Sequence, residues 1–189
     1  MPQILILSGS DAGAEKLSAL AAGLDGAEVT ALRTGKAGRR AALSGEYGLI
    51  ILNTPLTDGF GDETAWFLAE NTTAGVLLLV REDQMSQVRD AAAQAGVAVL
   101  TKPFSRELFW SAARLCLATQ TRLQRLLAEN RALEVRMEET KIVGRAKCVL
   151  IQHLNMTEPQ AHRYIEKQAM DMRVSRAEVA RGILSAYEF

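Results

Sequence analysis

The chain is poor in the residues that usually hold disulfide frameworks and metal sites together. Its two cysteines in 189 residues, Cys116 and Cys148, stand far apart. This spacing argues against a disulfide framework and favours a reducing, cytoplasmic compartment. Its two histidines, His153 and His162, have no cysteine or carboxylate neighbours at metal-ligand spacing. We therefore predict no metal site and no cofactor.

Long apolar runs are also missing. No stretch approaches the roughly 20 apolar residues of a membrane span. The N-terminal sequence MPQILILSGSD has no basic flank before its short apolar run, which makes it a poor secretory signal. Apolar residues make up 48% of the chain and charged residues 23%, an ordinary globular mixture. We expect a protein without membrane spans, with one full domain and a smaller second one.

The net charge is zero, but the charges are unevenly distributed along the chain. Residues 1–118 contain 10 Lys and Arg against 13 Asp and Glu, and residues 119–140 contain four of each kind. Residues 141–189 contain eight Lys and Arg against five Asp and Glu. A mildly basic C-terminal part permits nucleic-acid binding. A solvated helical face would have the same composition, so charge alone does not decide between them.

Short apolar runs without alternation predict strands that are buried on both faces of a parallel sheet. Helix-forming stretches alternate with these runs, which predicts an α/β, flavodoxin-like doubly wound domain over residues 1–118. Its functional residues should follow the carboxyl ends of the strands. The expected strands are Gln3–Leu7, Gly48–Leu52, Val76–Val80, Val97–Leu100 and, more weakly, Glu28–Leu32, and the expected helices are Ala12–Gly23, Gly38–Ser44, Glu63–Asn71 and Met85–Ala95.

The residues after these strands carry a resemblance to the response-regulator receiver family. Lys102 and Pro103 match the lysine–proline pair that the family places after its fifth strand. The family's acidic pair after the first strand is replaced by Ser8 and Gly9. Its phosphoacceptor aspartate after the third strand is replaced by Asn53, and no hydroxyl residue follows the fourth strand. Most of the family's working groups are therefore absent.

These replacements predict a pseudo-receiver without a phosphoacceptor. The amide of Asn53 cannot act as the nucleophile that forms an acyl phosphate. Without convergent carboxylates, the loops also offer poor ligands for Mg²⁺. Asp11 and Asp58 are alternative acceptors, but neither directly follows a strand. In this interpretation Lys102 braces a loop.

A long helix is expected from Ser105, a good N-cap residue, to about Leu154, because this stretch has no proline and one glycine. Over residues 119–140 we predict a coiled-coil linker. Leucines at core positions together with a single asparagine at an a position are typical of a parallel two-stranded coiled coil, so we expect a homodimer. A surface helix packed on its own domain is the alternative. The heptad places Leu123, Asn130 and Met137 at a, and Leu126 and Leu133 at d.

Residues 141–189 predict a module of three short helices that share a small core. Two capping boxes, Thr157-x-x-Gln160 and Ser175-x-x-Glu178, mark the starts of the second and third helices, with Pro159 in the first turn of the second. The expected inward residues are Val143, Ala146, Val149, Leu150 and Leu154 on the first helix, Ala161, Tyr164, Ile165, Ala169 and Met172 on the second, and Val179, Ile183 and Leu184 on the third.

The residue order of this module resembles the ANTAR family, an RNA-binding output module of bacterial transcription antiterminators. Three positions depart from the usual family pattern: Cys148, Ile151 and Glu166, the last where a basic residue is common. The matching residues are Ala146–Lys147, Leu150–Ile151, Glu158 with Ala161, Ala169–Met170 with Arg173, and Val179–Ala180.

The resemblance implies an antiterminator that binds stem-loops of a leader transcript and catalyses no reaction. With phosphorylation lost, control would come from dimerisation, a regulatory protein or a small-molecule ligand. Basic and polar residues suited to RNA phosphates or bases are Arg145, Lys147, Gln152, Arg163, Lys167 and Arg173, with Lys141 and Arg176 as further basic candidates.

Two other functions are consistent with the same residues. A DNA-binding regulator would need a helix-turn-helix tail, and its last helix offers only Arg176 and Arg181 as base-reading residues. A protein-interaction adaptor would use the tail to bind protein, with its basic residues incidental. An enzyme is the least favoured class, because the sequence contains no nucleophile–base pair.

Overall fold

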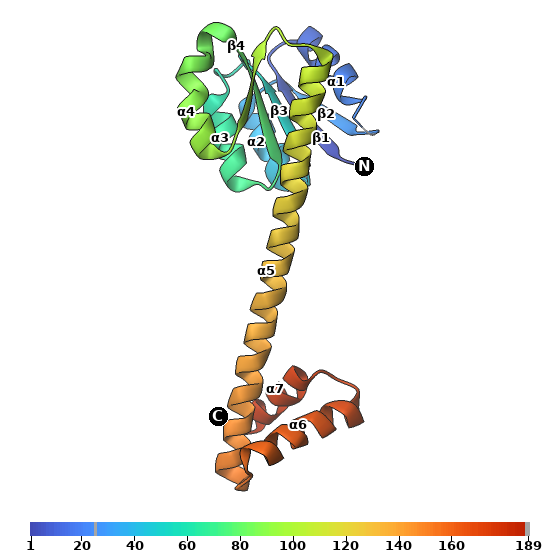
Figure 1. The fold of residues 1–189 in the computed structure, drawn as a ribbon, viewed down its shortest axis with the longest axis vertical. Helices are drawn as coiled ribbons and strands as arrows, with labels where there is room; N and C mark the ends of the chain where they lie inside the picture. The colour runs from blue at the N-terminus through green and yellow to red at the C-terminus, as the bar shows by residue number, and fades with distance from the viewer. Residues whose placement is uncertain (25, 188–189) are drawn as a thin grey trace. The chain divides into compact units, whose positions relative to one another are not determined.

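A computed structural model describes residues 1–24 and 26–187, which divide into two compact units, Met1–Arg125 and Leu126–Phe189 (Figure 1). The last two residues of the predicted C-terminal module, Glu188 and Phe189, lie outside the described residues. Within those ranges, none of the helices combines the length and apolar character needed to cross a membrane.

The first unit is a five-stranded parallel sheet with helices on both faces (Figure 1). The strand order is β2-β1-β3-β4-β5. The predicted doubly wound α/β fold is confirmed, and the predicted strands lie close to the observed ones. The strands are β1 (Gln3–Ser8), β2 (Glu28–Leu32), β3 (Leu49–Asn53), β4 (Gly75–Arg81) and β5 (Ala98–Lys102).

The two faces of the sheet build two separate hydrophobic cores. The central strands are buried on both sides, since Ile4 and Leu5 belong to different cores and both are 0% exposed. This double burial explains why their sequence shows no alternation. Helices α2 (Gly35–Ser44), α3 (Asp62–Asn71) and α4 (Met85–Ala95, preceded by the short 3₁₀ helix Glu82–Gln84) contribute to one core, and α1 (Asp11–Ala21) and the start of α5 (Arg106–Leu154) to the other.

Helix α5 runs without interruption from Arg106 to Leu154, through both predicted domain boundaries. It begins as predicted, because Leu108 N–H donates to Ser105 Oγ at 3.2 Å. Its first turns bury Phe109 against the sheet. From residue 121 to residue 138 every side chain is exposed, including all five residues of the predicted coiled-coil core.

In the second unit, the last turns of α5 pack with α6 (Glu158–Met172) and α7 (Arg176–Tyr187). Both predicted capping boxes are present. Thr157 N–H donates to Gln160 Oε1 at 2.8 Å, and Ser175 N–H donates to Glu178 Oε2 at 2.8 Å. The shared core consists of Ala146, Val149, Leu150, Ala161, Ile165, Ala180 and Leu184.

Three residues expected in this core are exposed, so their prediction is wrong. Leu154 is 45%, Tyr164 39% and Met172 62% exposed. Leu154 and Met172 are the last residues of their helices, where neighbouring elements no longer cover them. Tyr164 lies about 100° around α6 from the buried Ile165, and so small a core covers only a narrow stripe of each helix.

Candidate functional site

The carboxyl ends of β1, β3 and β5 bring Ser8, Asn53 and Lys102 together. Asn53 Nδ2 donates to Ser8 Oγ at 3.0 Å, and Lys102 Nζ donates to Asn53 Oδ1 at 3.0 Å. Lys102 Nζ also donates to the carbonyl oxygen of Thr54 at 2.6 Å, which ties the lysine to the loop after β3. Burial, with a smaller contribution from Arg81, lowers the pKa of Lys102. These polar groups therefore satisfy one another.

The two alternative acceptor aspartates are engaged elsewhere. Asp11 Oδ2 accepts from Arg33 Nη1 at 3.2 Å. The Asp58 carboxylate accepts from the backbone N–H of Gly35 at 2.8 Å and of Lys36 at 3.0 Å, at the start of α2. These bonds, with Lys36 the larger, lower the pKa of Asp58. In the part of the chain that the structure describes, no three His, Cys, Asp or Glu side chains cluster as metal ligands would.

Gly9, directly after β1, lies against the loop that follows β3. A Cβ atom built on Gly9 would lie 2.6 Å from the carbonyl oxygen of Pro55. Such a contact is too short for a side chain of any kind. An acid at this position therefore requires the backbone around Pro55 to move.

Gly9→Ala is expected to destabilise the first unit by about 1–3 kcal/mol, because it overpacks a backbone contact. Gly144 in α5 has no atom within 4 Å of its missing Cβ. Gly144→Ala should therefore stabilise the chain by roughly 0.5–1 kcal/mol through helix propensity. Urea unfolding of the two variants measures both effects. Effects of the same sign would contradict the close approach at Gly9.

A second hollow, which we call the α5–α6–α7 groove, lies within the second unit and has a volume of about 820 Å³. It brings together the cations of Arg136, Lys147 and Arg176. Lys147 is the one residue of the six predicted RNA contacts that lines it. The lining residues are Arg136, Glu139, Thr140, Val143, Gly144, Lys147, His162, Ser175, Arg176 and Ala177.

Two glutamates pair with two of the three cations of the groove, Lys147 and Arg176. Lys147 Nζ lies 2.6 Å from Glu158 Oε1. Glu166 Oε1 lies 3.3 Å from His162 Nε2 and 3.4 Å from Arg176 Nη1. The hydrogen bond and charge of Lys147 lower the pKa of Glu158. The positive charge of the groove is thus partly neutralised, and a bound anion would have to displace these carboxylates.

The other predicted contacts lie on different surfaces. Arg145 is two positions before Lys147, about 200° around α5, and Gln152 is two turns after Arg145 on the same exposed side. Arg163 and Lys167 lie one turn apart on the exposed side of α6. Arg173 ends α6 in the left-handed conformation, with φ 54°. The structure therefore does not bring the six residues together.

The groove also contains two residues that were not predicted as contacts, Arg136 and His162. Arg136 is one of the charged residues that flank the heptads. His162 was predicted to have no carboxylate neighbour, and its 3.3 Å contact with Glu166 corrects that prediction. A signal existed for Arg136. It precedes Lys147 by eleven residues, three helical turns, which places both side chains on one face of α5.

Comparison with known proteins finds matches to both units. The ANTAR domain model matches residues 131–184. The transcriptional regulatory protein PdtaR of Mycobacterium tuberculosis is 31% identical over 136 residues, or 72% of this chain and 66% of that protein. The chain thus spans just under two thirds of its curated relative's length.

Solved structures match the first unit. A two-component response regulator from Clostridium difficile superposes with a TM-score of 0.56 at 21% identity, covering 62% of this chain and 97% of that one. The signal receiver domain of an HD domain-containing protein from Pseudomonas fluorescens gives a TM-score of 0.60 at 18% identity, covering 66% and 92%. At these identities the likeness establishes the fold alone.

Proposed function

Because this chain is an ANTAR-domain protein with a receiver-fold domain at its N-terminus, we propose that it is a cytoplasmic, RNA-binding transcription antiterminator. It binds stem-loops of a leader transcript, stabilises the fold that competes with a terminator, and catalyses no reaction. The observation that carries the proposal is that the ANTAR match contains the whole α5–α6–α7 groove with its cations.

The groove is suited to the phosphates of an RNA loop. Arg136 and Arg176 offer planar guanidinium groups for two-point contacts with phosphate oxygens, and Lys147 offers a point charge. Binding transfers Lys147 from Glu158, and Arg176 from Glu166, to the RNA. The exposed basic residues outside the groove extend the positive surface toward the flanking backbone.

Gel-shift titration tests this proposal with three nucleic acids: a two-hairpin leader RNA, the same hairpins with scrambled loops, and the duplex DNA equivalent. We expect tight binding to the first and weaker binding to the other two. Preference for the duplex DNA would favour the helix-turn-helix alternative. Absence of binding to all three would favour the adaptor, and equal binding would reduce the groove to a nonspecific basic surface.

The middle of α5 supports a homodimer. Its apolar side chains have no covering partner among the described residues, since Leu123 is 42%, Leu126 52%, Leu133 57% and Met137 61% exposed. They recur at heptad spacing along one helix face. We propose that two copies pair here as a parallel coiled coil, with Asn130 fixing the register, so that each dimer presents two ANTAR modules to paired loops.

We further propose that the first unit works without phosphorylation. Ser8, Asn53 and Lys102 stand at the positions of a receiver's phosphorylation residues and are hydrogen-bonded to one another. The close approach at Gly9 leaves no room for an acid there. Because this pocket has no phosphoacceptor, a partner protein, a ligand or dimerisation would control RNA binding instead.

Incubation with acetyl phosphate and Mg²⁺ should leave the protein unlabelled and its oligomeric state unchanged. Asn53→Asp should also stay unlabelled, because positions 8 and 9 still supply no carboxylate for the metal. Intact-protein mass spectrometry measures the label, with an active receiver as positive control. Labelling of the wild-type chain would refute phosphorylation independence.

A further inference from the structure

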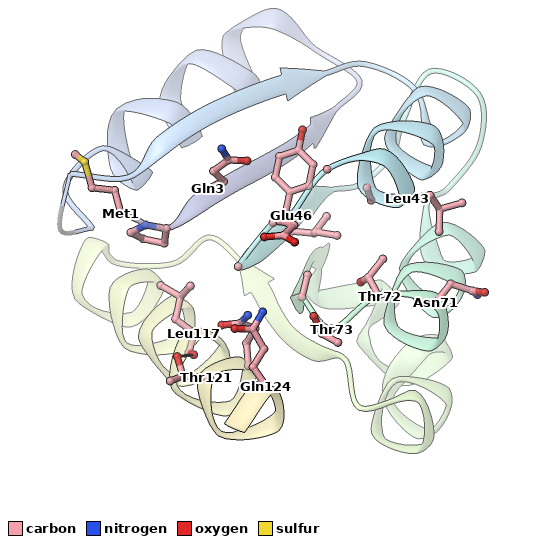
Figure 2. A pocket seen from close by; sticks show the side chains of 18 residues that line it. Met1, Gln3, Leu43, Glu46, Asn71, Thr72, Thr73, Leu117, Thr121 and Gln124 are labelled. Atoms are coloured by element: carbon pink, nitrogen blue, oxygen red, sulfur yellow. Dashed lines mark hydrogen bonds between the residues drawn. The ribbon is translucent and has the colours of Figure 1, made fainter. Parts of the chain in front are cut away.

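A hollow of about 750 Å³ lies in the first unit at the amino ends of β1, β3 and β4, opposite the end that holds Asn53. We call it the amino-end cleft. Figure 2 shows Leu117, Thr121 and Gln124 of α5 on one side of it, and Leu43, Asn71 and Thr72 on another. Its size lies within the range of roughly 300–1,000 Å³ that small-molecule sites occupy.

Gln120 is the informative residue of this cleft. Its side chain is only 8% exposed and lines the hollow. The Gln120 amide forms no hydrogen bond with any part of the chain that the structure describes. Its polar atoms still reach the solvent of the cleft, because no fully enclosed polar atom lacks a partner within those residues. An amide that is nearly buried but open to the cleft can pair with a molecule bound there.

Most other polar groups around Gln120 divide into two kinds. Asn71 Nδ2, Thr72 Oγ1 and Thr121 Oγ1 donate back to carbonyls of their own helices, at 2.9, 2.6 and 2.9 Å. The amides of Gln3 and Gln124, the hydroxyl of Tyr47 and the carboxylate of Glu46 have no such bond and line the cleft. The available groups are thus dominated by amides, each of which offers a donor and an acceptor side by side.

The charge of the cleft limits its ligand. No Lys or Arg side chain is among the lining residues, and the two charged groups on the lining, the N-terminal ammonium of Met1 and the carboxylate of Glu46, have opposite signs. The cleft therefore has no net positive charge that would favour a phosphate or another anion. A glutamine amide pairs through two hydrogen bonds with the donor–acceptor edge of a base such as adenine. The ring of Tyr47 and the side chain of Leu117 supply apolar surface for the faces of a heterocycle.

We propose that the amino-end cleft binds an uncharged nucleobase or nucleoside, with Gln120 as its central hydrogen-bonding residue. Gln120 and Gln124 lie on α5 on either side of Leu123, where the exposed apolar stripe begins. A ligand held by both amides would therefore act on α5 at the start of the proposed dimer contact. The proposal does not depend on RNA binding.

Isothermal titration of the full chain with adenosine, guanosine, cytidine and uridine tests the site, with the matching 5′-monophosphates as charge controls. We expect at least one nucleoside to bind, and its monophosphate to bind at least about tenfold more weakly, since each lost or opposed polar contact costs about one factor of ten. Absence of binding by all four nucleosides at millimolar concentration, or tighter binding of the monophosphates, would overturn the proposal.

Gln120→Leu should weaken nucleoside binding by at least about tenfold. It should leave the melting temperature of the free protein equal or higher, because the leucine gives up no hydrogen bond to the described residues. Gln124→Ala changes an exposed side chain and should weaken binding without affecting the fold. Gln94→Leu, on the exposed side of α4, is the matched control and should bind normally. Unchanged binding in both Gln120→Leu and Gln124→Ala would rule out the site.

Discussion

Leu133→Asp is expected to convert the protein from a dimer into a monomer. Pairing of two helices would bury Leu133 from each copy, and losing the two buried leucines removes about 4 kcal/mol of apolar burial. The desolvation of two facing aspartates adds to this loss. The dimer Kd should therefore rise by about a thousandfold or more. Sedimentation velocity over a wide concentration range measures the change.

Val135→Asp is the matched control for this variant. Val135 is 58% exposed and Leu133 57%, so the two are equally accessible in the single chain. Val135 occupies an f position of the heptads, outside the predicted seam. The control should remain dimeric. A wild-type chain that is monomeric at high concentration, or equal loss of dimer in both variants, would refute the coiled coil.

Replacing Lys147 and Arg176 together by alanine should weaken binding to the leader RNA by about a hundredfold. Hydrogen bonds to charged groups contribute about 1.5 kcal/mol or more each, and each such loss is roughly a factor of ten. The slope of log affinity against log salt should fall by roughly 0.7–0.9 for each lost phosphate contact. Surface ion pairs contribute little to stability, so the module should stay folded by circular dichroism.

Two comparisons make the experiment specific to the groove. Arg163→Ala with Lys167→Ala removes the same number of charges from the exposed side of α6, outside the groove lining, and should cost much less affinity. Glu166→Gln removes the carboxylate that holds His162 and Arg176, and should raise RNA affinity several-fold. A larger loss from the α6 pair would move the interface to that surface, and weaker binding by Glu166→Gln would contradict competition by the carboxylate.

The features that depend on local chemistry could be predicted from the sequence. The sheet was predictable because strands buried on both faces leave unbroken apolar runs, whereas the half-exposed edge strand β2 gave only a weak signal. The capping boxes at Thr157 and Ser175 were predictable because their hydrogen bonds span only three residues. The heptad spacing of Leu126 and Leu133 could be seen in the sequence because both residues belong to one helix, and both side chains are exposed there.

The features that join distant residues could not be predicted in this way. The groove combines side chains of three helices, and the pairing of Glu166 with Arg176 depends on how α6 and α7 meet. The 2.6 Å approach of Pro55 to Gly9 depends on the path of a loop. The missing partner of Gln120 is visible only once its neighbours are known. Beyond the spacing of Arg136 and Lys147 within α5, residue type and spacing carry none of this information.

The hydrogen-bonded pocket around Asn53 also determines how many changes phosphate chemistry would require. A return to phosphate chemistry would need an acid at position 53 and carboxylates for a metal at positions 8 and 9. Asn53→Asp alone gives up the amide hydrogen bond to Ser8, and an acid at position 9 meets the Pro55 carbonyl. No single substitution therefore assembles the phosphoryl-transfer site. Several simultaneous substitutions, together with a shift of the Pro55 backbone, would be needed to build it.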